Sequence, residues 1–301
     1  MKIVSYYEKA VKSRFFLSYK INKAIINVVY PFIRITENGT DKSSDIILSL
    51  TSHPGRIKVV HLTVKTLLRQ TLKPKTVILW LASDQFPGGE KELPKKLLGL
   101  KKYGLEIRFC DNLYSHKKYY YAMKEYPNNK IITADDDVFY PENLVENLSK
   151  LSEKYPNTVC CNWCNRFALD DDGDVYSYEK WSGIDETPVP SIEVFPVGIG
   201  GVLYPPGALN SEVLNREAIE ETCISADDLW LKAMAVMNRT KAVKVPGQTR
   251  IYFSIVNTKK TGLYHANVGD SKSPDSWRNI MEKYPRCREI LIEEISGKNQ
   301  N

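Results

Sequence analysis

Three consecutive carboxylates, Asp135, Asp136 and Asp137, directly follow the apolar run 131–134. Acidic side chains at the end of a buried strand repel one another and lose hydration, so such a cluster persists most easily with positive charge beside it. A hard divalent cation that also binds phosphate oxygens suits that role best. The alternative is a solvated acidic turn, which is the commoner origin of an acid triplet taken alone.

The spacing of Asp135 and Asp137 places both carboxylates on the same side of an extended chain. One can then ligate a metal while the other reaches a ribose hydroxyl or a metal-bound water. Transfer from a nucleotide-diphosphate needs this arrangement, because the charge of the leaving diphosphate has to be neutralised. We therefore expect Mg²⁺ or Mn²⁺, which suit oxygen ligands, as the cofactor.

A second acidic pair, Asp227 and Asp228, lies at the start of a helical pattern that runs from residue 226 to residue 238. Acidic residues in the first turn of a helix are stabilised by the helix dipole, so a purely structural role is one interpretation. The other is that one carboxylate faces a pocket and serves as a general base, which removes the proton from an attacking hydroxyl.

Glycines and lysines supply further candidates. Gly198, Gly200 and Gly201 lie in a strand-like segment, where glycine marks either a tight bend or a close approach of the backbone to a ligand. Lys117 and Lys118 begin a helical pattern before the acid triplet. They either neutralise phosphate or are ordinary surface lysines.

Three other patterns are less informative. The acidic turn at 170–174 would need glutamate at the twelfth position of a calcium loop, but Trp181 stands there, so a solvated hairpin turn is expected. His265, taken alone, is more often a packed or surface residue than a ligand. Of the six cysteines only Cys161 and Cys164 form a CxxC pair, which indicates reduced thiols in a cytosolic protein rather than a zinc site.

Charge is concentrated at one end of the 301-residue chain. Residues 1–34 contain seven basic side chains and one acid, which accounts for the whole formal net charge of +6. The remainder is balanced, so nucleic acid is not expected as a partner. No stretch reaches the roughly 18–20 apolar residues that span a bilayer, and the N-terminus lacks the pattern of a signal peptide.

The basic residues of 1–34 are mixed with apolar ones at helical spacing. This predicts an amphipathic helix that either lies in an anionic membrane surface or packs on the main domain. A polar stretch at 36–45 indicates a linker.

Beyond it, apolar strand patterns alternate with helical patterns. Predicted strands cover 45–50, 76–81, 105–110, 130–134, 158–163 and 243–245, and predicted helices cover 57–70, 90–103, 116–126, 141–154 and 226–238. Such alternation predicts an α/β fold with a mostly parallel central sheet and helices on both faces. Ligands of such sheets bind beyond the carboxyl ends of the strands, so the loops at 51–56, 82–87, 111–118 and 135–137 should share one edge.

In their order along the chain, these features resemble a glycosyltransferase of the Rossmann-like GT-A fold, close to the bacterial family 2-like enzymes that build surface polysaccharides. The elements are the loop Thr51–Arg56, the strand end Ala82-Ser83-Asp84, Asp135–Asp137 as the DxD motif, the glycine segment 198–201, and the pair Asp227-Asp228. The resemblance covers roughly residues 45–268 and implies a catalytic domain there. It leaves an N-terminal segment and linker at 1–44 and a helical tail at 269–301.

The resemblance also implies roles for individual residues. Asp137, Asp135 and His265 would ligate the metal, and Asp228, or else Asp227, would be the base of an inverting transfer. A nucleotide-sugar donor, expected to be UDP-linked, would be held by Thr51, His53, Arg56, Asp84, Lys117, Asp135, Asp136, Gly200 and Gly201. The pair Lys117-Lys118 replaces the small residues that are usual at that place in family 2.

The expected function is metal-dependent transfer of a sugar from a nucleotide-diphosphate sugar to a glycan or lipid-linked acceptor, in the cytoplasm or at the inner face of the cell membrane. A single base without a second nucleophile favours inversion, by analogy with glycoside hydrolysis. One alternative is a sugar nucleotidyltransferase, which expects a glycine-rich phosphate loop where 51–56 offers one glycine. The other is a non-catalytic metal- or carbohydrate-binding module.

Overall fold

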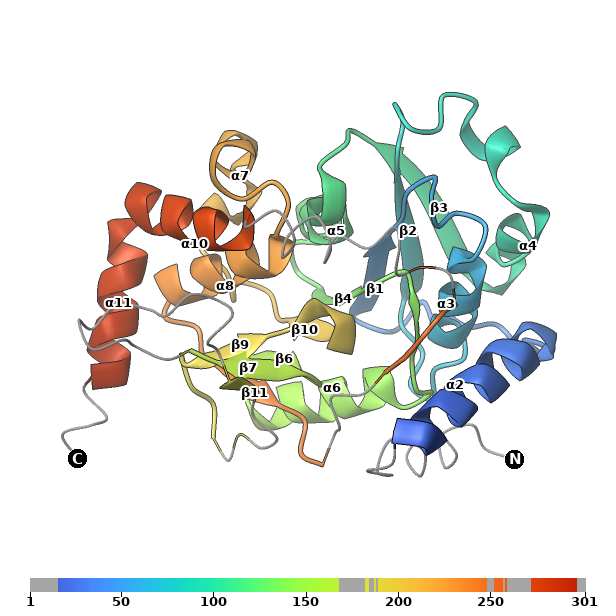
Figure 1. Ribbon diagram of the computed structural model, residues 1–301, viewed down its shortest axis with the longest axis horizontal. Helices are drawn as coiled ribbons and strands as arrows, with labels where there is room; N and C mark the ends of the chain where they lie inside the picture. Colours follow the sequence, from blue (N-terminus) through green and yellow to red (C-terminus); the bar gives the residue numbers. More distant parts are fainter. Residues whose placement is uncertain are drawn as a thin grey trace.

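A seven-stranded sheet with the order β11-β6-β10-β4-β1-β2-β3 forms the centre of the molecule (Figure 1). The computed structural model describes residues 16–167, 182–183, 187, 189–247, 252–256, 258 and 272–296. The strands are β1 Ile46–Thr51, β2 Thr76–Ala82, β3 Leu105–Cys110, β4 Lys130–Ala134, β6 Val159–Cys161, β10 Val202–Tyr204 and β11 Ala242–Lys244. β10 is antiparallel to both neighbours, and the other pairs are parallel, so the predicted mostly parallel sheet is confirmed.

Helices cover both faces of this sheet because its central strands are apolar on both sides. Ile47 and Ile131 pack with Ala122 of α5 (Lys117–Glu125) on one face. Leu48 and Leu50 point to the other face, where they join one apolar cluster with α3 (Val60–Leu67) and α6 (Leu144–Lys154). The predicted α/β class with helices on both faces is therefore confirmed.

A second apolar cluster lies around α8 (Asp227–Met237), where Trp230 is fully buried. α7 (Arg216–Thr222), α10 (Lys272–Lys283) and α11 (Pro285–Ser296) surround it, and Figure 1 shows all four helices at one end of the sheet. A three-stranded sheet, β8-β7-β9, lies beside them, formed by Ser182–Gly183, Cys164–Arg166 and Val194–Pro196. None of the six cysteines forms a disulfide, and all are buried except for the half-buried Cys110.

At the N-terminal end, α2 (Phe16–Val29) packs on the main domain, followed by the 3₁₀ turn η1 (Tyr30–Phe32). The ring of Tyr19 stacks on Phe253 at 5.4 Å between centroids, and Lys23 Nζ donates to Ser254 Oγ at 2.5 Å. The stretch 36–45 has no helix or strand, but it is fixed in place, because the amides of Gly39 and Asp41 donate to backbone carbonyls of the domain. No helix within the described ranges is long and apolar enough to cross a membrane.

The predicted helix at 90–103 is wrong. It divides into η2 (Gly89–Glu92), α4 (Lys95–Leu98) and η3 (Lys101–Tyr103). Pro94 lacks a backbone donor and disfavours a helical residue before it, so Leu93 is extended. Gly104 then ends the segment with a φ of 103°.

Five short elements complete the part of the fold that the structure describes. They are η4 Tyr114–His116, β5 Val138–Phe139, η6 Gly198–Gly200, η7 Ser211–Leu214 and β12 Phe253–Ser254. β5 pairs antiparallel with β12, which brings the chain near residue 255 beside the acid triplet. The predicted strand at 158–163 ends at Cys161.

Candidate functional site

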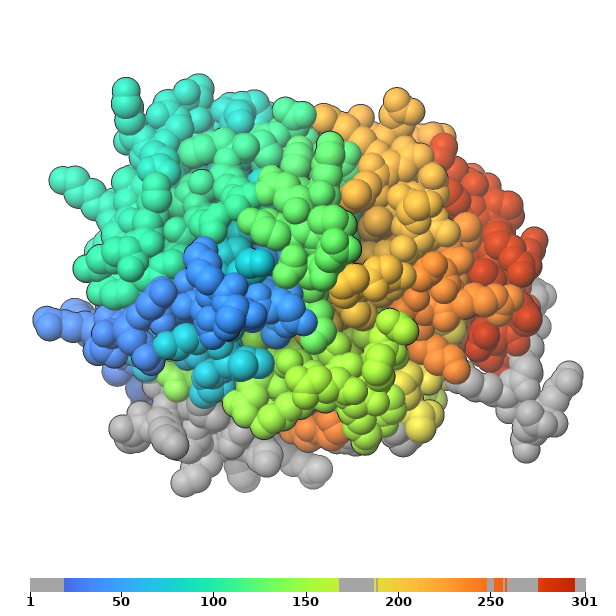
Figure 2. Space-filling model, turned by 180° about the vertical axis from the view of Figure 1, so that it is seen from behind, coloured from blue at the N-terminus to red at the C-terminus, as the bar shows by residue number. Residues whose placement is uncertain are grey.

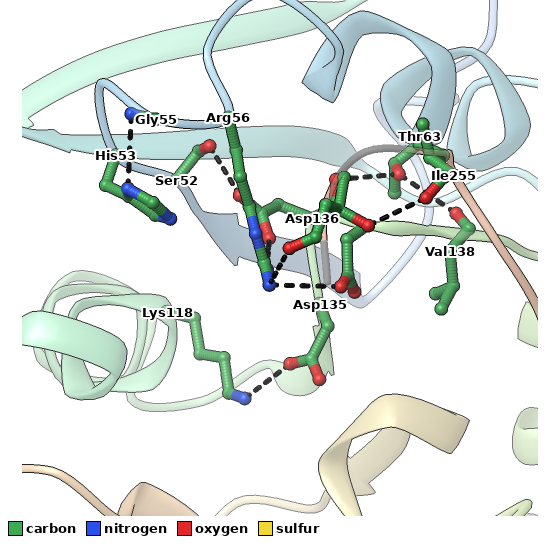
Figure 3. A network of polar contacts seen from close by, with 12 residues as sticks. Ser52, His53, Gly55, Arg56, Thr63, Lys118, Asp135, Asp136, Val138 and Ile255 are labelled. Atoms are coloured by element: carbon green, nitrogen blue, oxygen red, sulfur yellow. Dashed lines mark hydrogen bonds and ion pairs between the residues drawn. The ribbon is translucent and has the colours of Figure 1, made fainter. Parts of the chain in front are cut away.

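The loops that follow β1, β3 and β4 meet at one edge of the sheet, as the alternating pattern predicts. Arg56, from the loop after β1, forms ion pairs with two members of the acid triplet after β4 (Figure 3). Lys118, in the first turn of α5, pairs with the third member. The acid triplet therefore lies among protein cations at the carboxyl edge.

Asp136 is held from two sides. Its Oδ1 lies 2.5 Å from Arg56 Nη1, and its Oδ2 accepts a hydrogen bond of 2.5 Å from Ser52 Oγ. Arg56 Nη2 also lies 3.1 Å from Asp137 Oδ2. Asp136 is buried, and a buried carboxylate needs partners of this kind. The carboxylate of Asp136 is thus used for contacts within the protein, whereas Asp135 and Asp137 are partly exposed to solvent.

The backbone of the triplet is fixed as firmly as its side chains. Thr63 Oγ1, on α3, is within hydrogen-bond distance of the carbonyls of Asp136 and Val138, at 3.0 and 2.9 Å. The amide of Ile255 donates to the carbonyl of Asp137 at 2.8 Å. These contacts turn the chain sharply after β4 and hold the carboxylates at the edge.

Tyr140 connects the triplet to the glycine segment. Its hydroxyl accepts from the amide of Asp135 at 2.8 Å and donates to the carbonyl of Ile199 at 3.1 Å. The expected strand-like character of 198–201 is wrong, because η6 occupies 198–200 and β10 begins only at Val202. A Cβ on Gly200 would lie 2.7 Å from Cβ of Trp163, and Gly201 has a φ of 80°, so a tight bend accounts for both glycines.

Lys118 lies at the centre of the acidic groups. Its Nζ is 2.8 Å from Asp135 Oδ1 and 2.8 Å from Asp227 Oδ2, and its carbonyl accepts from Ser49 Oγ of β1. Burial alone lowers the pKa of Lys118, but the charges of Asp135, Asp227 and Asp228 outweigh it and raise the pKa well above its usual range. The interpretation of Lys118 as a surface lysine is therefore wrong.

The two aspartates at the start of α8 differ in titration. Burial raises the pKa of Asp227, but the attraction of Lys118 and then His116 is stronger and lowers it. Burial and then the charge of Asp227 raise the pKa of Asp228 to about 7, against the opposing effect of Lys118. Asp228 Oδ2 also accepts from the amide of Gly198 at 2.9 Å. Neighbouring carboxylates whose pKa values are pushed apart can take different chemical roles, and Asp228 is the one suited to exchange a proton near neutral pH.

The loops after β2 and β3 are linked through Asn112. Its Nδ2 donates to Asp84 Oδ2 at 3.4 Å, and its Oδ1 accepts from Lys117 Nζ at 3.1 Å. Asp84 is exposed at the edge, whereas Lys117 is buried, and burial lowers its pKa. Lys117 thus lies among the edge loops and not on the open surface.

Thr51 and His53 precede Arg56 in the loop after β1. Thr51 Oγ1 donates to the carbonyl of Trp80 at 2.8 Å, so this hydroxyl joins the loop to β2. His53 Nδ1 accepts from the amide of Gly55 at 3.3 Å. Burial lowers the pKa of His53, which favours the neutral ring.

Sequence reasoning did not single out Ser52, Tyr140 or Asn112, although each fixes a candidate residue. Ser52 lies within the loop 51–56, but its hydrogen-bond partner Asp136 is 84 residues away. Tyr140 follows the apolar β5, where a tyrosine indicates only burial. His265 and the acidic turn at 170–174 lie outside the described residues.

Asp135 and Asp137 are the carboxylates that fit a divalent cation. The described part of the chain contains no group of three or more His, Cys, Asp or Glu side chains able to hold one. Mg²⁺ is nevertheless commonly bound through one or two protein carboxylates, with substrate phosphates and waters as its other ligands. Asp135 and Asp137 therefore suit a cation that substrate phosphates and waters also ligate, and not a site made of protein ligands alone.

Comparison with known proteins gives distant structural likenesses. No protein-family model matches the chain, and no curated protein matches it. A mannosyltransferase from Pyrobaculum calidifontis in complex with GDP-Man and Mn²⁺ is 10% identical, with a TM-score of 0.43 over 92% of this chain and 80% of its own. CMP:2-keto-3-deoxy-manno-octonic acid synthetase complexed with CTP is 11% identical, with a TM-score of 0.40 over 75% of this chain and 98% of its own. The chemistry of this chain has to be inferred from its own residues.

Replacing Lys118 should destabilise the protein strongly. Lys118→Met leaves Asp227 and Asp135 without their cation, and breaking a buried ion pair in this way costs about 3–5 kcal/mol. Lys117→Met is the matched control, because the neighbouring lysine is also buried but its ammonium donates to the neutral amide of Asn112. It should cost about 1 kcal/mol. Urea unfolding followed by tryptophan fluorescence measures both, and equal losses would contradict the central role of Lys118.

Asp228→Asn should change how stability depends on pH. The folded-state pKa of Asp228 is about 7, and an unfolded aspartate has a pKa of about 3.9. Between these values the folded state holds the proton that the unfolded state has lost, so the wild type loses stability as pH rises through this interval. Asparagine does not titrate. The free energy of unfolding of the variant minus that of the wild type should therefore increase from about pH 4 to about pH 7 and then level off; a difference independent of pH would refute the raised pKa.

Proposed function

We propose that this protein is a nucleotide-sugar-dependent glycosyltransferase, which transfers a sugar to a hydroxyl of a glycan or lipid-linked acceptor. The observation that carries this proposal is the arrangement around Lys118. Lys118 Nζ pairs with Asp135 of the acidic edge after β4 and with Asp227 of α8, whose neighbour Asp228 has a pKa raised to about 7. Transfer from a nucleotide sugar needs both parts, because one neutralises a leaving diphosphate and the other activates a hydroxyl.

The donor is assigned to the carboxyl edge. Asp137 and Asp135 would hold Mg²⁺ or Mn²⁺, with His265 as a further candidate ligand, and the metal when bound neutralises charge on the leaving diphosphate. Around the nucleotide, which we take to be uridine diphosphate, we place Asp84 against the base. The other donor contacts are assigned to Thr51, His53, Arg56, Lys117 and Asp136.

The acceptor is assigned to the side of Asp228. As the acceptor oxygen forms its bond to the anomeric carbon, the bond from that carbon to the diphosphate breaks, and the hydroxyl proton passes to the Asp228 carboxylate. Asp227 is held ionised by Lys118, which leaves it in a positioning role. A single base and a single displacement give inversion at the anomeric carbon.

A sugar nucleotidyltransferase is the second candidate. Arg56 and Lys117 place positive charge among the edge loops, and such charge also suits a nucleoside triphosphate. The two candidates differ in the ligand they bind most tightly: a nucleotide sugar for the transferase, or a nucleoside triphosphate for the nucleotidyltransferase. A non-catalytic binding module would bind a metal or carbohydrate ligand but would catalyse no transfer.

A thermal-shift panel of nucleotide sugars and nucleoside triphosphates, each with and without Mn²⁺, tests donor class and metal together. A ligand at about 100 times its Kd stabilises the folded state by about 2.7 kcal/mol. We expect the largest shift with a UDP-sugar and Mn²⁺, and we expect Asp137→Asn to lose the part that depends on Mn²⁺. Asp111→Asn is the control, because Asp111 is an exposed acid of the edge paired with Arg216. A larger shift with a nucleoside triphosphate would favour the second candidate, and no shift with any ligand would refute both.

Asp228→Asn should separate catalysis from binding. Loss of a general base lowers kcat by about 10²–10⁴, while the affinity for the donor should stay within about twofold. Because the base must be deprotonated to act, kcat/KM of the wild type should rise with pH through about 7. Initial rates across pH with the best donor measure this. Loss of donor binding along with activity would show that Asp228 is structural.

A further inference from the structure

α2 has a second face that the described residues leave open. Ile21, Ile25, Val28, Val29 and Phe32 are 50%, 42%, 67%, 50% and 82% exposed. Positions 21, 25, 28 and 32 follow helical spacing, so these side chains form one stripe, which we call the α2 stripe. Figure 2 shows α2 lying uncovered along the outer face of the molecule.

The orientation of the α2 stripe is fixed, because the opposite face of the helix is anchored. Asn27 donates to the carbonyl of Ser254 and accepts from the amide of Val256. At the end of the helix, Lys65 Nζ donates to the carbonyls of Tyr30 and Pro31 at 3.2 and 3.0 Å. The exposed apolar side chains are therefore held facing away from the residues on which α2 packs.

Basic residues lie near the end of the stripe. Arg34 is exposed two residues after Phe32, and its carbonyl accepts from Arg69 Nη1 at 2.8 Å. The pKa of Lys65 is lowered by burial and then by the charges of Arg69 and the exposed Lys96, so these cations lie near one another. The nearby acids Glu142 and Glu37 are paired with Arg69 and Lys73.

The sequence before the helix adds charge of the same sign. Residues 1–15 contain Lys2, Lys9, Lys12 and Arg14 against the single acid Glu8. An apolar stripe flanked by basic residues is typical of a helix that lies in the plane of a membrane interface, where apolar side chains enter the acyl boundary and cations contact anionic headgroups. A second copy of the chain fits less well, because a twofold contact would bring the like charges of both copies together.

We propose that the α2 stripe docks this protein on an anionic lipid bilayer. The surface is separate from the acidic edge, and the proposal does not depend on the function of that site. The amphipathic pattern of 1–34 leaves membrane and domain packing as alternatives, but the structure uses one face of α2 for packing and leaves the other for the bilayer.

Sedimentation of the full chain with vesicles tests this proposal. We expect binding to vesicles of phosphatidylcholine mixed with phosphatidylglycerol, weaker binding to phosphatidylcholine alone, and release by salt. Val28→Glu and Phe32→Glu should each weaken binding at least about tenfold. Val189→Glu is the matched control, since Val189 is 63% exposed outside the stripe and should leave binding unchanged.

Three outcomes of the sedimentation and light-scattering measurements would overturn the proposal. The first is that the wild type does not bind anionic vesicles, and the second is that Val189→Glu weakens binding as much as the stripe variants do. The third is that light scattering shows Phe32→Glu to convert a dimer into a monomer while vesicle binding is unchanged, which would assign the stripe to a second copy of the chain. A further variant tests insertion without adding charge. Phe32→Trp should gain fluorescence quenching by brominated lipids, and the absence of quenching at saturating vesicles would equally contradict docking through this stripe.

Discussion

The pairing of a buried lysine with acids from distant parts of the chain is the constraint on which the site depends. Lys118 can be buried only with its charge compensated, and its two ion-pair partners are Asp135 at the end of β4 and Asp227 at the start of α8. Burying it therefore brings the C-terminal helices to the carboxyl edge of the sheet. Burial, together with the carboxylate left in excess where one cation is shared among neighbouring acids, raises the pKa of Asp228 to about 7.

Much of the fold could be predicted from the sequence, because its central strands are apolar on both faces. The strands at 105–110 and 130–134 have the boundaries that the pattern predicts, and the loops after β1, β3 and β4 meet at one edge as parallel strands require. The prediction of one helix at 90–103 was wrong for a local reason. The apolar spacing continues through Pro94, but the helical backbone conformation is interrupted there. Periodicity records where side chains point and says little about where hydrogen bonding is interrupted.

The candidate site could be predicted in part. The acidic residues at strand and helix ends were visible, because charge beside an apolar run is unusual. The pairing of Arg56 with Asp136 and that of Lys118 with Asp227 were not visible, since the partners lie 80 and 109 residues apart and no local pattern records them. The expectation that the acid triplet needs positive charge was physically sound, but the structure supplies that charge first from protein side chains. Any metal must therefore join carboxylates that already have partners.

The bend at η6 has a consequence for how this site can vary. Asp228 is held by a main-chain amide, that of Gly198, and η6 is tied to the acid triplet through the carbonyl of Ile199. The separation between the two acidic centres is thus set by backbone groups of η6, which substitutions of the η6 side chains leave in place, together with the hydroxyl of Tyr140 that bonds to the amide of Asp135. Gly198 is the exception, because a Cβ there would lie 2.6 Å from Asp228 Oδ1 and 3.1 Å from Lys118 Nζ. Diverged relatives that keep this spacing should be recognisable by that glycine even where the surrounding residues have changed.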